Sequence, residues 1–268
     1  MEHPIVTLTT DWGNQGFFAG MVKGLLYSMV PGVQVVDITH HIELSKVLEA
    51  SFVVKHGCLG FPAGTIHIVD VGGNPLDPDP FVAVRARGQY FVCCNNGLPA
   101  MVLGNEVEEA VSLPMQANHV YNFAAYSLMA PAAARLANGD ALAQVGTPLT
   151  QLSQRMPPRW IRQGDQIHIP IMYIDSYGNA YLGMSYREFE EEREGRPFVL
   201  QARDLRISEI RSSYHTTPSS TQLQAIPSNR ELCLTVSSTG MLELAIPNSS
   251  FARMVGMRLS EMVLLTFR

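Results

Sequence analysis

The chain has 268 residues, of which 46% are hydrophobic and 16% are charged, and its formal net charge is -5. A chain of this length buries a full core and is typical of two domains. Its negative charge and the lack of a Lys/Arg cluster argue against a nucleic-acid surface. Its apolar runs all fall short of the roughly 18 residues that a membrane span needs. We therefore expect neither a nucleic-acid nor a membrane partner.

The cysteines and the amino terminus bear on the cellular compartment. Cys58, Cys93, Cys94 and Cys233 form no C-x-x-C pair, and two adjacent cysteines do not easily bridge to each other. The segment Met1-Glu2-His3-Pro4 lacks the basic and then apolar layout of a signal peptide. We expect reduced thiols and a cytoplasmic location.

The first half of the chain alternates strand and helix patterns. Apolar residues from Phe18 to Met29 recur on one helical face, and Pro31-Gly32 ends the pattern. The remaining expected elements are a buried strand Val33–Ile38, a helix Glu43–His56 with Leu44 facing inward, a strand Thr65–Val71, and strands Phe81–Arg85 and Gln89–Val92. This alternation predicts an α/β domain with a mostly parallel sheet.

The pattern changes in the second half. Tyr121 to Leu136 is expected to be helical, with a kink or a new start at Pro131. The stretch 154–164 is rich in Pro and Arg and is interpreted as a linker, which divides the chain into domains 1–153 and 165–268. Strand-like runs separated by turn-rich segments predict that the second domain is small, mostly β, and barrel-like.

Two carboxylates follow predicted parallel strands. Asp11 comes after the first strand and Asp70 lies at the end of the third, so both could face one crevice at the carboxyl edge of the sheet. Asp11 has two interpretations: it accepts hydrogen bonds from a diol such as a ribose, or it caps the following helix. If Asp77, in the loop after Asp70, approaches Asp70, their mutual repulsion would raise the pKa of one of the two and make it a general base, although a solvated turn also explains Asp77.

Other familiar chemistries lack their sequence signals. Gly13-x-x-Gly16 is without the first glycine of a dinucleotide fingerprint, and there is no phosphate-binding loop. His40 and His41 point to opposite faces if they lie on a strand, and no spacing matches a zinc site. We expect no metal.

Eight short motifs in order carry a resemblance that runs through nearly the whole chain. They are Thr9-Thr10-Asp11-Trp12-Gly13, Val36-Asp37-Ile38-Thr39-His40, Phe61-Pro62-x-Gly64-Thr65-x-His67, Val69-Asp70, Asn95-Asn96-Gly97-Leu98, Ala130-Pro131-Ala132-Ala133-Ala134, Ile174-Asp175-x-Tyr177-Gly178-Asn179 and Gly240-Met241-Leu242-Glu243-Leu244-Ala245. With these motifs the chain resembles the S-adenosylmethionine (SAM) hydroxide adenosyltransferase family, which also contains the fluorinase and chlorinase enzymes.

The resemblance implies an amino-terminal α/β domain, a carboxy-terminal β-barrel, and a homotrimer with sites at subunit interfaces. It also implies displacement of methionine from the 5′ carbon of SAM, with SAM as substrate and no separate cofactor. Site residues implied by the resemblance are Asp70 for water activation, Asp11 for the ribose, Phe123 near the reacting carbon, Asn179 for adenine, Asp175 for the methionine amino group and Ser238 for its carboxylate.

The chain departs from the family pattern at positions expected to activate water and at positions expected to bind the methionine part of SAM. The Arg expected seven residues after Asp70 is Asp77, and the expected His is Ala124. At the methionine end, Gly16 and Thr239 stand where charged residues are expected. Three functions stay open: a SAM hydrolase with a rebuilt water site, an enzyme for another nucleophile or another 5′-substituted adenosine, and a non-catalytic SAM- or adenosine-binding protein.

Overall fold

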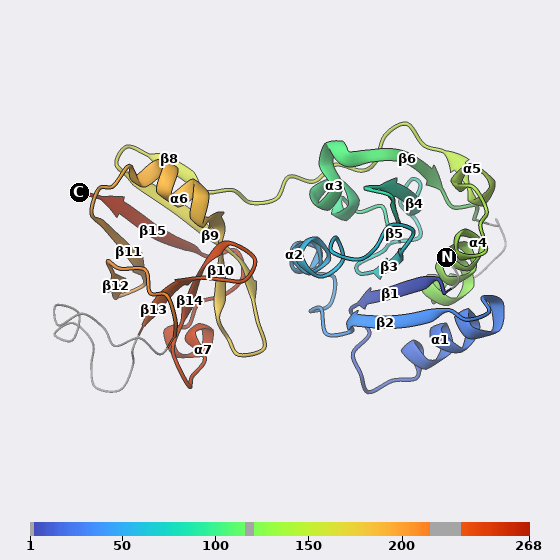
Figure 1. The fold of residues 1–268 in the computed structure, drawn as a ribbon, viewed down its shortest axis with the longest axis horizontal. Coiled ribbons are helices and arrows are strands. Elements are labelled where there is room, and N and C mark those ends of the chain that lie inside the picture. Colours follow the sequence, from blue (N-terminus) through green and yellow to red (C-terminus); the bar gives the residue numbers. More distant parts are fainter. Residues whose placement is uncertain (1–2, 116–120, 215–231) are drawn as a thin grey trace. The chain divides into compact units, whose positions relative to one another are not determined.

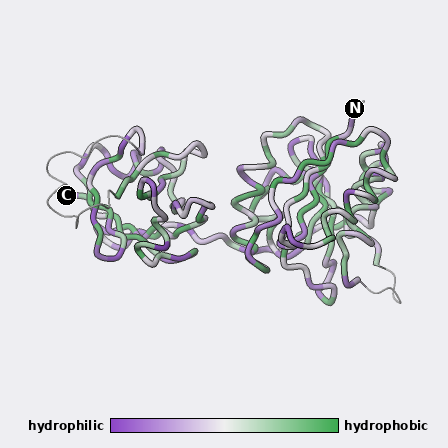
Figure 2. Tube along the Cα trace, turned by 90° about the horizontal axis from the view of Figure 1, so that it is seen from below, coloured by the Kyte–Doolittle hydropathy of each residue, from purple (hydrophilic) through white to green (hydrophobic). Residues whose placement is uncertain are grey.

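The computed structural model describes residues 3–115, 121–214 and 232–268. The chain divides into two compact units, Met1–Pro157 and Pro158–Arg268, which are described separately (Figure 1). Hydrophobic and hydrophilic stretches alternate along the trace of both units (Figure 2).

The first unit is built on a seven-stranded mixed sheet with the order β2-β1-β3-β5-β4-β6-β7. Neighbouring strands β2, β1, β3 and β5 are parallel, and β4, β6 and β7 extend the sheet antiparallel. Their bounds are β1 (Ile5–Thr10), β2 (Gln34–Thr39), β3 (Ile66–Asp70), β4 (Phe81–Ala86), β5 (Gln89–Cys94), β6 (Val107–Ser112) and β7 (Thr147–Pro148). The expected α/β class is confirmed.

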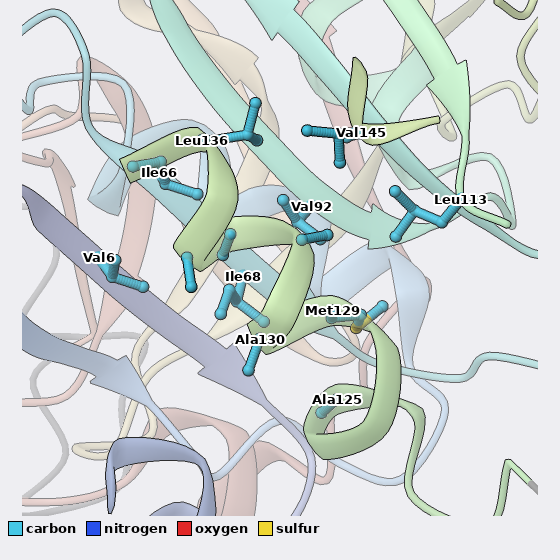
Figure 3. Close-up of a cluster of buried hydrophobic side chains, with 14 of the residues drawn as sticks. Val6, Ile66, Ile68, Val92, Leu113, Ala125, Met129, Ala130, Leu136 and Val145 are labelled. Atoms are coloured by element: carbon cyan, nitrogen blue, oxygen red, sulfur yellow. The ribbon is translucent and has the colours of Figure 1, made fainter. Parts of the chain in front are cut away.

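Helices cover both faces of this sheet (Figure 1). One face carries α1 (Phe18–Met29), the π-helix η2 (Ala125–Met129), α4 (Ala130–Ala137) and α5 (Leu142–Val145); the other carries α2 (Val47–Gly57) and α3 (Leu98–Leu103), which a 3₁₀ turn η1 (Gly104–Glu106) follows. Figure 3 shows η2 and α4 over the strands, where Met129 and Ala130 meet Ile68. Each large aliphatic side chain buried there contributes about 1.5–3 kcal/mol.

Three sequence predictions for this unit are corrected. The strand at Val33–Ile38 is β2, which lies at the sheet edge and is only half-buried, because apolar content does not reveal a strand's place in a sheet. The helix expected from Glu43 begins at Val47, and Leu44 is 76% exposed. The helix expected from Tyr121 starts as η2, and Pro131 lies in the first turn of α4.

The second unit is an antiparallel, barrel-like sheet with the order β12-β11-β15-β9-β10-β14-β13, and β8 pairs with β9. A bridge between Arg211, which follows β12, and Thr235 in β13 joins the two ends of this order. The strands are β8 (Ile161–Gln163), β9 (Gln166–Ile174), β10 (Ala180–Ser185), β11 (Phe198–Ala202), β12 (Leu205–Ile207), β13 (Cys233–Val236), β14 (Met241–Ala245) and β15 (Met262–Phe267). The expected barrel-like second domain is confirmed.

The described part of the second unit also contains two short helices, α6 (Tyr186–Arg193) and α7 (Phe251–Val255), whose Phe189 and Phe251 lie in its core. Strand β8 occupies residues 161–163, inside the stretch interpreted as a linker. Among the residues that the structure describes, no helix is both long and apolar enough to cross a membrane.

Candidate functional site

The candidate site lies at the carboxyl edge of the parallel strands in the first unit. Asp11 directly follows β1, Asp70 ends β3, and the register of the two strands pairs Thr10 with Asp70. Both aspartates line one pocket of about 360 Å³. The described residues lining it are Asp11, Trp12, Phe18, Leu44, Ser45, Asp70, Gly72, Gly73, Pro75, Phe81, Tyr121, Asn122, Phe123 and Ala124. The structure therefore brings Asp11, Asp70 and Phe123 together.

Asp11 is held by the loop that precedes α2. Its Oδ2 accepts a hydrogen bond from the backbone N–H of Ser45 at 3.0 Å. Ser45 has the left-handed backbone conformation, with φ of 60°, which turns this loop over the pocket. Helix α1 begins at Phe18, seven residues after Asp11, so the interpretation of Asp11 as its N-cap is wrong. The carboxylate instead ties two loops together at the pocket.

Asp70 has a hydrogen-bond donor at each carboxylate oxygen. The Trp12 indole Nε1 donates to Oδ2 at 2.9 Å, and the Cys94 thiol donates to Oδ1 at 3.5 Å. Burial raises the pKa of the Asp70 carboxyl above its ordinary value, and the nearby charge of Asp11 raises it further. The two hydrogen bonds lower this pKa, because they stabilise the charged form.

The carboxylate whose charge acts on Asp70 is Asp11, and Asp77 belongs to a separate turn. Asp77 Oδ1 accepts a hydrogen bond from Asn74 Nδ2 at 2.8 Å, and its backbone N–H donates to the Asn74 carbonyl at 3.1 Å. Asp77 is exposed and is not among the pocket-lining residues. The structure therefore supports the turn interpretation of Asp77, and the like-charge pair forms between Asp70 and Asp11.

Aromatic rings form one wall of the pocket. Phe123 meets the Trp12 ring edge-on at a centroid distance of 5.0 Å, and it meets Phe18 in the same way at 5.0 Å. Trp12 in turn stacks on His40 at 5.6 Å. Phe123 lies just before the π-helix η2, a type of irregularity that is frequent at functional sites. Ala124 also lines the pocket, and its methyl group cannot titrate.

The backbone after Asp70 is fixed by Asn96. Its Nδ2 donates to the carbonyls of Val71 and Gly72 at 2.8 and 3.1 Å. The preceding Asn95 is buried, and its Oδ1 accepts a hydrogen bond from the Ser153 backbone N–H at 2.9 Å. The Asn95-Asn96 pair therefore braces the pocket in addition to forming a turn.

The second unit places two predicted residues in the turn between β9 and β10. Asp175 Oδ1 accepts hydrogen bonds from the backbone N–H groups of Tyr177 and Asn179 at 3.0 and 2.8 Å. Its other oxygen accepts from Asn179 Nδ2 at 3.3 Å. The two side chains thus form one compact polar turn, and Asp175 has a structural role there whatever else it binds.

A buried glutamate that the sequence analysis did not single out adjoins this turn. Glu243 in β14 is 1% exposed and accepts a hydrogen bond from the Tyr214 hydroxyl at 2.7 Å. Burial raises its pKa, and the Asp175 charge raises it further. The signal was present as a charged residue inside the apolar run Met241–Ala245. Ser238 lies on the exposed turn between β13 and β14, where Ser237 and Thr239 hydrogen-bond each other at 2.7 Å.

Within the described parts of the chain, no group of three or more His, Cys, Asp or Glu side chains is arranged to hold a metal ion. All four cysteines are buried, and none of them forms a disulfide.

Two family models match the chain. The SAM hydroxide adenosyltransferase N-terminal domain matches residues 6–146, and the C-terminal domain of the same family matches residues 169–264. The chain belongs to the SAM hydroxide adenosyltransferase family. The resemblance seen in the eight motifs is thereby confirmed, and each unit of the fold corresponds to one family domain.

Similar proteins include two (R)-S-adenosyl-L-methionine hydrolases. The protein from Salinispora tropica is 29% identical over 192 residues, which cover 68% of this chain and 72% of the relative. The protein from Salinispora arenicola is 28% identical over 188 residues, which cover 67% of this chain and 71% of the relative. These identities are those of divergent relatives.

Solved structures share the fold over nearly the whole chain. An uncharacterized conserved protein from Thermotoga maritima superposes with a TM-score of 0.81 at 20% identity, covering 98% of this chain and 99% of its own. A conserved hypothetical protein from Thermus thermophilus superposes with a TM-score of 0.72 at 18% identity, and the superposition covers 99% of this chain and 100% of that protein. At these identities the likeness concerns the fold alone.

Proposed function

We propose that this protein hydrolyses SAM, displacing methionine with water to give adenosine and methionine. The family membership and the two Salinispora hydrolases support this reaction class. The observation that carries the proposal is the charge of the pocket. Among the described residues that line it, the only acidic or basic side chains are the carboxyl groups of Asp11 and Asp70. Such a pocket favours a cation, and the sulfonium of SAM is cationic.

In this proposal Asp70 is the water-activating group. Water attacks the 5′ carbon of the ribose, the new C–O bond forms as the C–S bond breaks, and the sulfur leaves as the neutral thioether of methionine. The proton of the water passes to Asp70, whose raised pKa makes it a better base than an ordinary carboxylate. Because the leaving group is already activated, the protein mainly aligns the water and excludes other solvent, and no separate cofactor is required.

Binding roles follow the same resemblance. Asp11 would accept hydrogen bonds from the ribose hydroxyls, because Ser45 occupies only part of the acceptor capacity of its carboxylate. Phe123 would pack beside the reacting carbon, in line with its place in the aromatic wall. In the second unit, Asn179 would contact adenine, Asp175 the methionine amino group, and Ser238 its carboxylate.

We further propose a cytoplasmic homotrimer with binding sites at the subunit interfaces, as the resemblance implies. Exposed apolar side chains on the first unit support an association surface, with Phe17 68% and Tyr27 57% exposed around α1. Light scattering after size-exclusion chromatography tests this assembly, and a monomeric mass across the working concentration range would rule it out.

The reaction is tested by incubating purified protein with SAM and following adenosine and methionine by chromatography. We expect equimolar products from the wild type and a loss of at least about 100-fold in Asp70→Asn, since general-base catalysis typically contributes 10²–10⁴-fold. Asp77→Asn is the matched control and is expected to keep wild-type turnover, because Asp77 lies in its own turn.

Other outcomes distinguish the remaining functions. SAM or adenosine binding without any product would identify a binding protein and contradict hydrolysis. Turnover that requires chloride, or that occurs only with another 5′-substituted adenosine, would assign a different nucleophile or substrate to the same pocket.

A further inference from the structure

Trp12 and Cys94 approach Asp70 from the two strands that flank β3. The sheet order β1-β3-β5 places Trp12, just after β1, on one side and Cys94, at the end of β5, on the other. The distance of 2.9 Å from Trp12 Nε1 to Oδ2 is typical of an N–H···O hydrogen bond, and the larger sulfur atom of Cys94 lies 3.5 Å from Oδ1. Each donor uses a different oxygen, so the plane of the carboxylate is set by two separate contacts.

Both donors are themselves held in place. The Trp12 ring is stacked on His40 and contacts the edge of Phe123. Cys94 is 2% exposed and packs against the loop that follows Asp70, since a Cβ added to Gly73 would lie 2.7 Å from its Sγ. Cys94 is not a pocket-lining residue, so its thiol contacts Asp70 from behind. A donor that is already ordered loses little further entropy when it holds its acceptor.

The electrostatic surroundings of Asp70 disfavour its ionised form, so hydrogen bonds that stabilise the carboxylate affect its pKa. Among the described residues, the titratable groups near it are Asp11 from the end of β1, Cys94 from β5, Tyr121 in the pocket lining, and His40 behind Trp12. No Lys or Arg is among the described pocket-lining residues. Burial and Asp11 both disfavour the ionised carboxylate, and hydrogen bonds from Trp12 and Cys94 are the stabilising contributions opposed to them.

We propose that Trp12 and Cys94 are the positioning residues of Asp70: their two hydrogen bonds hold its carboxylate ionised and oriented toward the pocket. The catalytic meaning of this pair rests on the proposed hydrolysis, because Asp70 needs a fixed, unprotonated oxygen to take a proton from water. The hydrogen bonds themselves are independent of turnover, so they are tested without it.

The test is a titration of Asp70 by NMR in the full-length protein carrying ¹³C-labelled aspartate carboxyls, with Asp70→Asn used to assign the signal. We expect Trp12→Phe to raise the pKa of Asp70 by about one unit, since a hydrogen bond to a charged group is worth about that much. Cys94→Ala is expected to raise it by a smaller amount because a thiol is a weaker donor. Cys94→Ser keeps a hydrogen-bond donor, so its Asp70 pKa should stay below that of Cys94→Ala.

The matched control is Cys93→Ala. Cys93 is an adjacent buried thiol whose Sγ lies near the Phe91 carbonyl rather than Asp70, so its loss should leave the Asp70 pKa unchanged. Equal pKa values in the wild type, Cys94→Ala and Trp12→Phe would overturn the proposal, even if the wild type hydrolyses SAM. If one variant does not fold, the other still decides the outcome.

A kinetic measurement separates this inference from the proposed function. In an active protein, the acidic limb of the kcat/KM profile for SAM should move upward in pH by the same amount as the NMR titration. Shifted NMR titrations in a protein that does not hydrolyse SAM would support the positioning role of Trp12 and Cys94, while the proposed hydrolysis would fail.

Discussion

His67 is a buried imidazole in β3, three residues before Asp70. Its Nδ1 hydrogen-bonds Thr7 Oγ1 at 2.8 Å, its ring stacks on Phe91, and its side chain is fully buried. Burial lowers the pKa of His67 to about 4. The native state therefore keeps this ring neutral at pH values where the unfolded chain, with an ordinary pKa near 6.5, binds a proton.

The consequence is a stability that falls as the pH is lowered. Between about pH 6.5 and pH 4 the unfolded state binds more protons, so unfolding becomes easier by up to about 1.4 kcal/mol per pH unit and about 3 kcal/mol in total. We expect His67→Gln to remove most of this slope, since glutamine stays neutral. Urea unfolding at several pH values measures it, with Trp12 fluorescence in a Trp160→Phe background reporting on the first unit.

His41→Gln provides the control for that experiment. His41 is exposed, and the side-chain contact of its Nε2 within the described chain is with Asn14 Nδ2 at 2.6 Å. The free energy of unfolding of His41→Gln should therefore fall with decreasing pH as steeply as that of the wild type. A slope that is the same in wild type and His67→Gln would show that other groups cause the acid sensitivity.

The sequence predicted the charged residues of the candidate site better than it predicted the residues that hydrogen-bond to them and to their loops. Asp11 and Asp70 were predicted from strand ends, because the carboxyl ends of parallel strands meet at one sheet edge. The contacts of Trp12, Cys94 and Asn96 were not predicted, because they join segments more than 20 residues apart through neutral donors. The spacing of residues within one segment of the sequence does not predict contacts between distant segments.

The turn between β9 and β10 is the element on which the second-unit residues depend. Gly178 has a φ of +84°, and a Cβ there would overlap the hydroxyl oxygen of Ser250. Ser250 in turn caps α7, where its Oγ accepts a hydrogen bond from the Arg253 backbone N–H at 3.2 Å. The Gly178 carbonyl also accepts from the backbone N–H of Ala252 at 2.9 Å. The turn and the start of α7 therefore pack as one element.

We expect Gly178→Ala to lower the free energy of unfolding of the second unit by about 3 kcal/mol or more, from backbone strain combined with overpacking. Gly240→Ala is the matched control, since its φ is +77° but a Cβ there meets no atom within 4 Å, so about 1 kcal/mol is expected. Urea unfolding followed by Trp160 fluorescence in a Trp12→Phe background measures both. Adding Ser250→Gly to Gly178→Ala should recover part of the loss; equal losses in the two alanine variants would contradict the predicted overlap.

The elements that sequence analysis missed are short or weakly amphipathic. Helix α6 has a complete capping box between Ser185 and Glu188, but only Phe189 is buried in it, so its apolar periodicity is faint. Helix α3 spans only six residues after Gly97, whose φ is +93°. The π-helix η2 has no sequence signal beyond Pro131, which marks the start of the next helix.

The joint between the two units is short. The Ser153 backbone N–H is bound to Asn95, and Arg155 packs against Gly97, so the chain stays on the first unit up to Arg155. Trp160 packs against the core of the second unit, and its Nε1 donates to Glu188 at 3.4 Å. Composition alone predicted a linker over 154–164, but it does not show that β8 begins at Ile161. Residues 156–159 lie between these two sets of contacts.

Among the residues that the structure describes, this joint is expected to be the first site of tryptic cleavage under native conditions. Arg159 and Arg155 are both exposed within residues 149–160, a stretch that has no helix or strand, but the backbone and Cβ of Arg155 lie against Gly97. A protease needs an extended, accessible backbone, so cleavage after Arg159 should precede cleavage after Arg155. Mass spectrometry of a short digest should therefore find a fragment ending at Arg159.

Arg159→Gln should abolish that fragment. The control is Arg162→Gln in β8, where Arg162 pairs with Glu192 at 2.7 Å, and this variant should leave the fragment unchanged. Early cleavage after Arg155 instead would mean that its packing on Gly97 opens readily in solution, and that the joint begins closer to β7.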